Sequence, residues 1–420
     1  MLLAALFALP AGCGPAGGAG ESVLRSANWS GPGNDPKFLG LERELIRGFE
    51  SGHPGVRVQV EQIPGPGLYE AKLLLMVLSG EPPDVLQLDA SSAAVLVDNG
   101  LLLDLAPYMA ADPDFRRDHY FDNVMEIARR GDKLFAVPLD FTPMVIVYNQ
   151  RLFDAAGVPY PHDNWSWDDF LRAARALTIE PSASRPKQYG FQFENWMPLW
   201  MPWIWANGGD VVGPDGRSVQ GCFDGPRSME AIRFLADLML VHRVAPTPRE
   251  SAAAGTDLFR AGRAAMILTG HWMLIEYKVD RLDIGVAPIP TNTGEPVTVM
   301  YASSLAVAAG ARHPRLAWEY VKFMTSEAVQ RRRVSTGLAI SGNRRTAEHY
   351  AAHDGLEAEF LRHAAYARPP IGSRVERYVA CEDFGREMFE DILNAGVPVE
   401  EAVQRAARLM QKVLARRAED

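Results

Sequence analysis

The sequence predicts an α/β protein built from two lobes, and three observations support this prediction. The chain has 420 residues, which is more than one average domain needs to bury a hydrophobic core. Hydrophobic residues make up 47% of it and charged residues 23%, values that are ordinary for a globular protein. Short β-rich runs alternate with helical apolar patterns along the chain, and this order favours β-α-β units.

The first part of the chain follows this β-α-β order. Apolar residues recur at helical spacing between Phe38 and Phe49, and a His-Pro-Gly turn then ends the helix. Asp89 lies at the carboxyl end of the third β-rich run, where open α/β sheets bind their ligands. We predict strands over 22–29, 56–60 and 83–90, and helices over 38–49 and 71–78.

The middle of the chain carries the clearest local signals. Residues 144–147 form a short β-rich run, and Asn149 is placed to cap a brief helix that Gly157 ends. Two prolines then hold the chain extended, because proline fixes φ and restricts the residue before it. Ser166 and Asp169 have the spacing of a capping box at the start of a longer helix.

The same stretch carries a resemblance to a known family. Its residues YNQRLFDAAG, followed by WSWDDF, resemble the extracellular solute-binding proteins of carbohydrate ABC importers, the maltose-binding-protein-like family. Further phrases with this likeness follow the family's order: FESGHPGVRV near residue 50, FRAGRAAMILTGHW over 259–272 and HPRLAWEYVKFMTS over 313–326. The resemblance covers nearly the whole chain after the first 21 residues.

The resemblance implies a two-lobed periplasmic-binding-protein-like fold of class II, with a hinge of about three crossings. Lobe one would contain residues 22–139 and 288–342, and lobe two residues 140–287 and 343–420. The implied function is to bind an extracellular sugar or oligosaccharide between the lobes and to deliver it to ABC permease subunits. We expect a monomer that is not an enzyme and needs no cofactor.

The densest aromatic segment spans residues 191–205. In its second part, residues 196–205, prolines disfavour a regular helix at the start, and we expect about half of the aromatic side chains there to face the cleft. We choose Trp200 and Trp203 for this role, with Asn195 as a polar partner. The alternative for each tryptophan is burial in the core.

Sugar-binding sites combine aromatic rings, which pack on the apolar sugar face, with polar side chains that bind the hydroxyl rim. Trp272 occupies a place where relatives commonly supply a stacking aromatic, with packing between the lobes as the alternative. Asp89 either binds ligand or caps the next helix, and Asp140 either contacts ligand or fastens the hinge. The predicted ligand-binding residues are Trp29, Asn34, Asp89, Asp140, Asn195, Trp200, Trp203, His271, Trp272, Tyr301 and Ser303.

Several classes of function find no support in the sequence. No phosphate-binding, nucleophile-elbow or metalloprotease motif occurs, and no pair of carboxylates lies in a context that favours acid–base catalysis. The net charge of −9 argues against nucleic-acid binding. Three cysteines, Cys13, Cys222 and Cys381, are too few for a zinc cluster, and whether the last two pair is left open. A secreted glycan hydrolase and a sensor subunit without transport remain alternatives.

The N-terminal residues resemble a bacterial lipoprotein signal. Residues 1–12 are apolar and end in small residues before Cys13, although Pro10 and the lack of a basic residue depart from the pattern. We expect cleavage before Cys13, lipid attachment to its thiol and a flexible tether over 13–21. The protein would then be exported and anchored at the outer face of the cytoplasmic membrane, or simply secreted to the periplasm.

Overall fold

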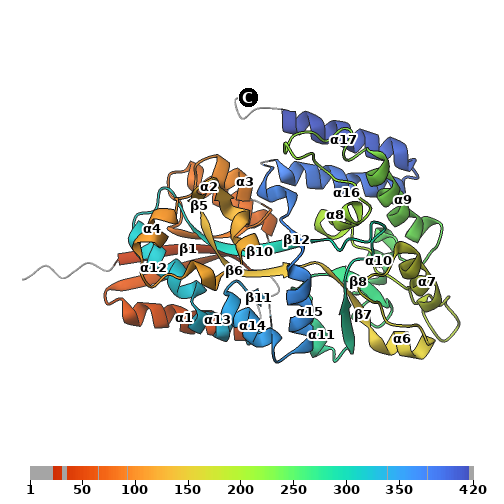
Figure 1. The fold of residues 1–420 in the computed structure, drawn as a ribbon, viewed down its shortest axis with the longest axis horizontal. Coiled ribbons are helices and arrows are strands. Elements are labelled where there is room, and N and C mark those ends of the chain that lie inside the picture. The colour runs from red at the N-terminus through yellow and green to blue at the C-terminus, as the bar shows by residue number, and fades with distance from the viewer. Residues whose placement is uncertain are drawn as a thin grey trace, which may run out of the picture.

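The computed structural model describes residues 22–30, 36–64, 66–91, 93–337, 339–375 and 377–415. Two bodies lie side by side, each built around its own β-sheet (Figure 1). The predicted signal peptide, the tether, the lipidation site Cys13 and the candidate Asn34 lie outside the described residues. No helix within the described ranges is long and apolar enough to cross a membrane.

The larger sheet has the strand order β11-β6-β10-β3-β1-β2, and β12 also pairs with β10. Strand β1 is parallel to β2 and β3, whereas β10 runs antiparallel to β3 and β6. The sheet is therefore mixed, and β10 joins its two halves. Its strands are β1 (Ser22–Ser30), β2 (Val56–Pro64), β3 (Val85–Asp89), β6 (Ala136–Pro143), β10 (Thr298–Val307), β11 (Ile340–Ser341) and β12 (Ala367–Arg368).

Helices cover both faces of the larger sheet. Successive strand residues point to opposite faces, so Val85 packs in the core cluster that contains Phe49 and Trp318, whereas Leu86 packs in the cluster that contains Tyr69. The surrounding helices are α1 (Pro36–Gly52), α2 (Pro66–Leu78), α3 (Ala93–Asp98), α4 (Ala106–Ala111), α5 (Asp122–Met125), α12 (Pro314–Thr325), α13 (Glu327–Val334) and α14 (Arg344–Ala351). A small hairpin pairs β4 (Arg129–Arg130) with β5 (Lys133–Leu134).

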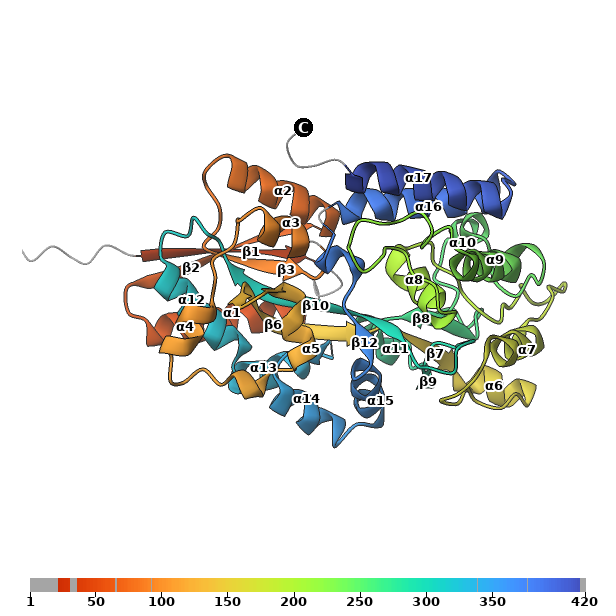
Figure 2. The same cartoon turned by 45° about the horizontal axis from the view of Figure 1, so that its top comes forward.

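The second body contains the smaller sheet, with the antiparallel order β8-β7-β9. Helices α16 and α17 pack against each other and against α9, along the upper edge of Figure 2. The strands are β7 (Val145–Asn149), β8 (Met266–Thr269) and β9 (Ile284–Ala287). The helices are α6 (Gln150–Ala156), α7 (Trp167–Leu177), α8 (Met197–Ala206), α9 (Pro226–Leu240), α10 (Pro248–Ala254), α11 (Leu274–Val279), α16 (Tyr378–Asn394) and α17 (Val399–Ala415).

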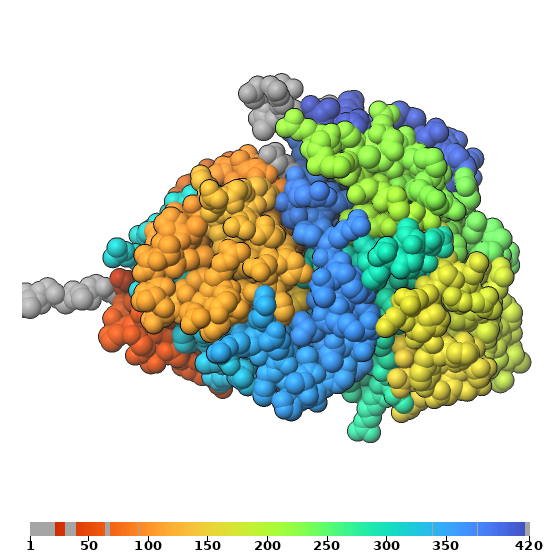
Figure 3. Space-filling view, in the orientation of Figure 1, coloured from red at the N-terminus to blue at the C-terminus, as the bar shows by residue number. Residues whose placement is uncertain are grey.

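The chain passes between the two bodies where β6 continues into β7, where β9 leads into β10, and where residues 365–375 lead towards α16. Helix α15 (Gly355–Ala364) packs against both β6 and β9, so it contacts strands of both sheets. In the space-filling view the blue segment that contains α15 lies between the two bodies (Figure 3). Helix α14, which the sequence analysis assigned to lobe two, contacts β11 and α13 of the larger body.

The local signals in the middle of the chain are confirmed. The side chain of Asn149 accepts a hydrogen bond from the backbone of Leu152, and Gly157 ends α6 in the left-handed region with φ of 63°. Ser166 and Asp169 form both hydrogen bonds of a capping box at the start of α7. These predictions are correct because the hydrogen bonds of the Asn149 cap and of the capping box join residues that are only three positions apart.

Candidate functional site

Polar and aromatic side chains gather where β1, β3 and β10 approach the second body. Ser303 of β10 lies opposite Asp89 in the antiparallel register, and its hydroxyl accepts a hydrogen bond from Gln87. The Asp89 carboxylate accepts hydrogen bonds from the backbone N–H of Ser91 (2.7 Å) and from its hydroxyl. Asp89 therefore orders the turn after β3 and remains half-buried at the carboxyl end of that strand, at the edge of the sheet that is formed by the strand ends.

Trp29 and Tyr69 extend this edge. Their rings meet edge to face, with centroids 5.4 Å apart, and both side chains come from elements that flank β3. The Tyr69 hydroxyl donates to the backbone carbonyl of Gln87 over 2.7 Å. This bond holds α2 against the strand that ends at Asp89.

The rings of Trp196 and Trp272 face this edge from the second body, and the ring of Tyr301 faces it from β10. The Trp196 ring precedes α8 and is 37% exposed. Its centroid lies 6.3 Å from that of Trp272 and 5.8 Å from that of Tyr301. The Trp196 indole Nε1 donates to the Glu382 carboxylate over 2.6 Å, which orients the ring. Asp89, Trp196, Trp272, Tyr301, Tyr378 and Glu382 together are called the junction site below.

The electrostatics of the junction site connect the two bodies. Burial raises the pKa of Glu382, hydrogen bonds from Tyr378 and Trp196 oppose this rise, and the Asp89 charge adds to it. Burial also raises the pKa of Asp89, against the hydrogen bonds from Ser91. The Asp89 charge contributes to the raised pKa of Tyr301 as well. The Asp89 charge on one body thus acts on the carboxyl group of Glu382 on the other.

This arrangement suits binding rather than covalent chemistry. Aromatic faces next to half-buried carboxylates match ligands that combine apolar C–H faces with hydroxyl groups. Within the described ranges, no group of three or more His, Cys, Asp or Glu side chains is arranged to hold a metal ion.

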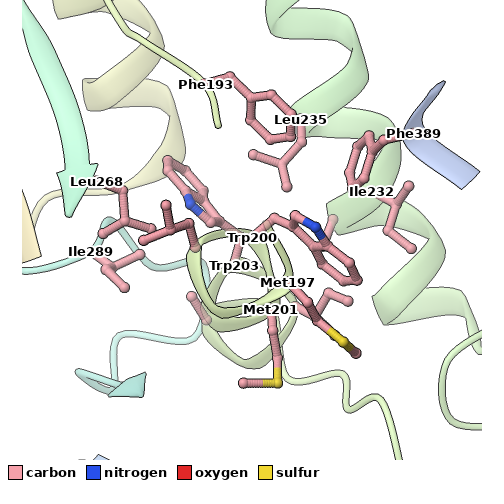
Figure 4. Packing of buried hydrophobic residues seen from close by; sticks show 14 of the residues in the cluster. Phe193, Met197, Trp200, Met201, Trp203, Ile232, Leu235, Leu268, Ile289 and Phe389 are labelled. Carbon is pink, nitrogen blue, oxygen red and sulfur yellow. The ribbon is translucent and has the colours of Figure 1, made fainter. Parts of the chain in front are cut away.

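The expectation that Trp200 and Trp203 face a cleft is wrong for this structure. Their side chains are 0% and 1% exposed, and Figure 4 shows both between α8 and the apolar residues of α9, β8 and α16. The predicted irregular start of residues 196–205 is also wrong, because α8 is a helix from Met197. Pro198 lies in its first turn, where no backbone N–H is needed, and all ten residues are buried.

His271 is also a core residue and not a ligand contact. Its ring is fully buried and its Nε2 lies 2.9 Å from a Glu357 carboxylate oxygen on α15. Its backbone N–H donates to the Thr142 hydroxyl of β6 over 2.8 Å. The residue therefore ties the segment after β8 to β6 and α15.

Two further candidates have structural partners. Asp140 pairs with Arg333 at 3.2 Å, which joins β6 to α13 within the larger body. Burial raises the pKa of Asp140, and Arg333 opposes that rise. The side-chain amide of Asn195 donates to the backbone carbonyl of Arg386 over 3.0 Å and so binds the loop before α8 to α16.

Sequence reasoning missed Trp196, Tyr378 and Glu382. Trp196 stands in the aromatic segment of residues 191–205, and the available signal was Pro198, which suits the first turn of a helix that begins just after Trp196. Tyr378 and Glu382 come from α16, and Glu382 lies 186 residues after its partner Trp196 in the sequence, so no local pattern marks them. The hydroxyls of Tyr301 and Tyr378 are 3.1 Å apart, which joins β10 to α16.

A separate groove of about 630 Å³ lies on the other side of the crossing strands. Strand β9, the start of α15 and the loop after α6 line it. In Figure 2, β9 and α15 lie below the crossing strands, whereas α2, α3 and α16 lie above them. The groove contains none of the sequence-predicted site residues. The groove is therefore distinct from the junction site.

Comparison with known proteins identifies related chains. Residues 36–331 match the sequence model of a protein family that is described as bacterial extracellular solute-binding protein. A putative binding protein of Brucella abortus is 24% identical over 315 residues, which are 73% of this chain and 72% of the relative. An uncharacterized lipoprotein of Streptomyces antibioticus is 26% identical over 348 residues, or 77% of this chain and 71% of the relative.

Solved structures have the same architecture. An ABC substrate-binding protein from Listeria monocytogenes, in complex with cycloalternan, matches with a TM-score of 0.82 at 23% identity, over 94% of this chain and 100% of that one. The sugar-binding protein MalE from Xanthomonas citri matches with a TM-score of 0.79 at 20% identity, over 94% and 98%. These matches confirm the predicted two-lobed α/β fold.

Proposed function

Because the chain belongs to the family of bacterial extracellular solute-binding proteins, we propose that it binds a sugar or oligosaccharide at the junction site. The observation that carries this proposal is the meeting of Trp196, Trp272 and Tyr301 beside two half-buried carboxylates. Rings at this spacing offer faces for the apolar side of a pyranose, and the carboxylates accept hydrogen bonds from its hydroxyls.

Ligand binding would bring the lobes together over the sugar. A ligand that contacts Asp89 on one body and Glu382 on the other stabilises the closed arrangement more than the open one. Permease subunits of an ABC transporter would then recognise the closed form. A relative from Deinococcus radiodurans is named a probable ABC transporter-binding protein, which supports this partner.

The family consists of solute-binding proteins rather than enzymes, so the hydrolase alternative has no support from relatives. We further propose that the protein acts outside the cytoplasmic membrane as a monomer, held by a lipid at Cys13. The Streptomyces relative named as a lipoprotein supports the anchor. Incorporation of a labelled fatty acid that is lost in a Cys13→Ala variant would test it.

A thermal-shift screen against neutral, amino and acidic mono- and oligosaccharides tests the binding proposal. A ligand at 100 times its Kd stabilises the folded state by about 2.7 kcal/mol, which such a screen detects. We expect a saturable response that Trp196→Ala and Trp272→Ala weaken about tenfold or more, since each removes a stacking face. No response from folded protein, or turnover of a sugar, would contradict the proposal.

A further inference from the structure

We infer that Tyr378 is a positioning residue of the junction site: its hydroxyl holds the Glu382 carboxylate against the Trp196 indole, and this contact fixes the exposed ring in the orientation that binds ligand. The inference rests on the proposed function and adds to it a residue that acts on the ligand only through its neighbours. It depends on a closed set of contacts among Trp196, Glu382, Tyr378 and Tyr301, which is called the positioning set below.

The Trp196 ring is exposed and needs contacts to select one orientation. It is 37% exposed and belongs to the residue before α8, whose backbone is extended (φ −130°, ψ 128°). An indole in such a place can adopt several staggered rotamers. Its Nε1 donates to the Glu382 carboxylate over 2.6 Å, and its face meets Tyr301 with centroids 5.8 Å apart. The hydrogen bond depends on direction, so it selects the rotamer.

Tyr378 supports the acceptor of this hydrogen bond. Its hydroxyl bonds to the carboxylate of Glu382, four residues later on α16, and side chains at this spacing lie on the same face of a helix. An ionised carboxylate only accepts, so Tyr378 is the donor, and its oxygen accepts from the Tyr301 hydroxyl, 3.1 Å away. Because the Tyr301 ring lies beside Trp196, the contacts form a closed set.

Burial holds the inner members of the positioning set in place. Tyr301 and Tyr378 are 7% and 1% exposed, and both belong to the core cluster that contains Phe389. Glu382 is half-buried. Since Tyr378 is covered, its effect on a ligand has to pass through Glu382 and Trp196. A ring that is fixed before binding loses less conformational freedom when the ligand arrives, and this strengthens affinity.

The indole N–H resonances of the free protein, measured by NMR, test the positioning set without a ligand. The chain has nine tryptophans, and Trp196→Phe keeps an aromatic ring but removes the N–H, so the lost signal is that of Trp196. We expect Tyr378→Phe to move this signal upfield, because the hydrogen bond to the carboxylate weakens. The signals of Trp165 and Trp167, whose N–H groups donate to backbone carbonyls elsewhere, should stay in place.

Calorimetric titration with the sugar that gives the largest response in the screen measures the effect on binding. Tyr378→Phe should weaken binding about fivefold or more, the factor that corresponds to one lost hydrogen bond. Glu382→Leu removes the acceptor at a similar side-chain size. In that background Tyr378→Phe should change the affinity less than about twofold, because no carboxylate remains to be positioned.

Tyr120→Phe is the matched control. Tyr120 is also a buried tyrosine, 4% exposed, and its hydroxyl donates to the Thr325 hydroxyl over 3.0 Å within the larger body. The variant loses a buried hydrogen bond of the same kind, so urea unfolding should show a loss of stability similar to that of Tyr378→Phe. The sugar affinity and the Trp196 signal should not change.

The outcomes separate the two proposals. If no sugar binds to the folded wild type, the proposed function fails, even where the Trp196 signal responds to Tyr378→Phe. If a sugar binds but Tyr378→Phe leaves the Trp196 signal or the affinity unchanged, the positioning role fails while the proposed function stands. An equal loss of affinity in the Glu382→Leu background, or in Tyr120→Phe, would also overturn the inference. Should Tyr378→Phe not fold, Tyr301→Phe takes its place, and an unchanged Trp196 signal in that variant would overturn the inference.

Discussion

The buried pair His271–Glu357 provides the sharpest test of how the two bodies are joined. Its side chains are 0% and 8% exposed, with Nε2 and the carboxylate oxygen 2.9 Å apart. The His271 ring also meets Phe360 with centroids 4.9 Å apart. His271→Ala leaves the Glu357 carboxyl group buried without this hydrogen-bond partner, and leaving a buried polar group unpaired costs about 1–3 kcal/mol. We therefore expect a lower free energy of unfolding by about this amount.

Urea unfolding followed by far-UV circular dichroism measures this loss. The matched variants are Glu357→Ala and the double variant, which together form a double-mutant cycle. We expect the double variant to lose less than the sum of the single losses, with a coupling of about 0.5–3 kcal/mol. Sugar binding should persist in His271→Ala, because the ring faces α15 and not the junction site. A loss below about 0.5 kcal/mol, or additive losses, would refute this reasoning.

Three further predictions follow from single contacts. Trp200→Ala should lower the free energy of unfolding by about 3–5 kcal/mol in urea, because it empties a fully buried site. Burial raises the pKa of Glu382 above the ordinary value of 4.5, so the contribution of Glu382 to the free energy of unfolding falls as the pH rises from about 4.5. Urea midpoints should therefore show Glu382→Gln to be more stable than the wild type at pH 7 and not at pH 4. A Cβ at Gly372 would lie 2.0 Å from the Ser91 carbonyl oxygen, so Gly372→Ala should weaken sugar binding in calorimetry, whereas Gly355→Ala, with no atom within 4 Å, should not.

The sequence predicted those features that depend on neighbours along the chain. The Asn149 cap and the Ser166–Asp169 capping box need only residues three positions apart, and both are present. The error over α8 has a local cause too, because proline in a first turn was taken as a helix breaker. Because this segment is a helix, Trp200 and Trp203 lie in the core and do not face a cleft.

The candidate site was predictable only in part. Asp89, Trp272, Tyr301 and Ser303 were chosen from strand ends and from the family resemblance, and the structure brings them to one region. Glu382 on α16 joins them through a contact between distant parts of the chain, and no spacing in the sequence predicts such a contact. His271 stands next to Trp272, yet its side chain points to Glu357, because neighbours in an irregular segment need not share a direction.

Hydrogen–deuterium exchange with and without a saturating oligosaccharide tests sugar binding at the junction site most directly, since it locates the ligand without any substitution. We predict slower exchange on binding in residues 85–91, 195–200, 270–273 and 378–383, which together carry the junction site. Protection confined to the groove segments 284–288 and 354–362, with no change at the junction site, would contradict the proposed binding site.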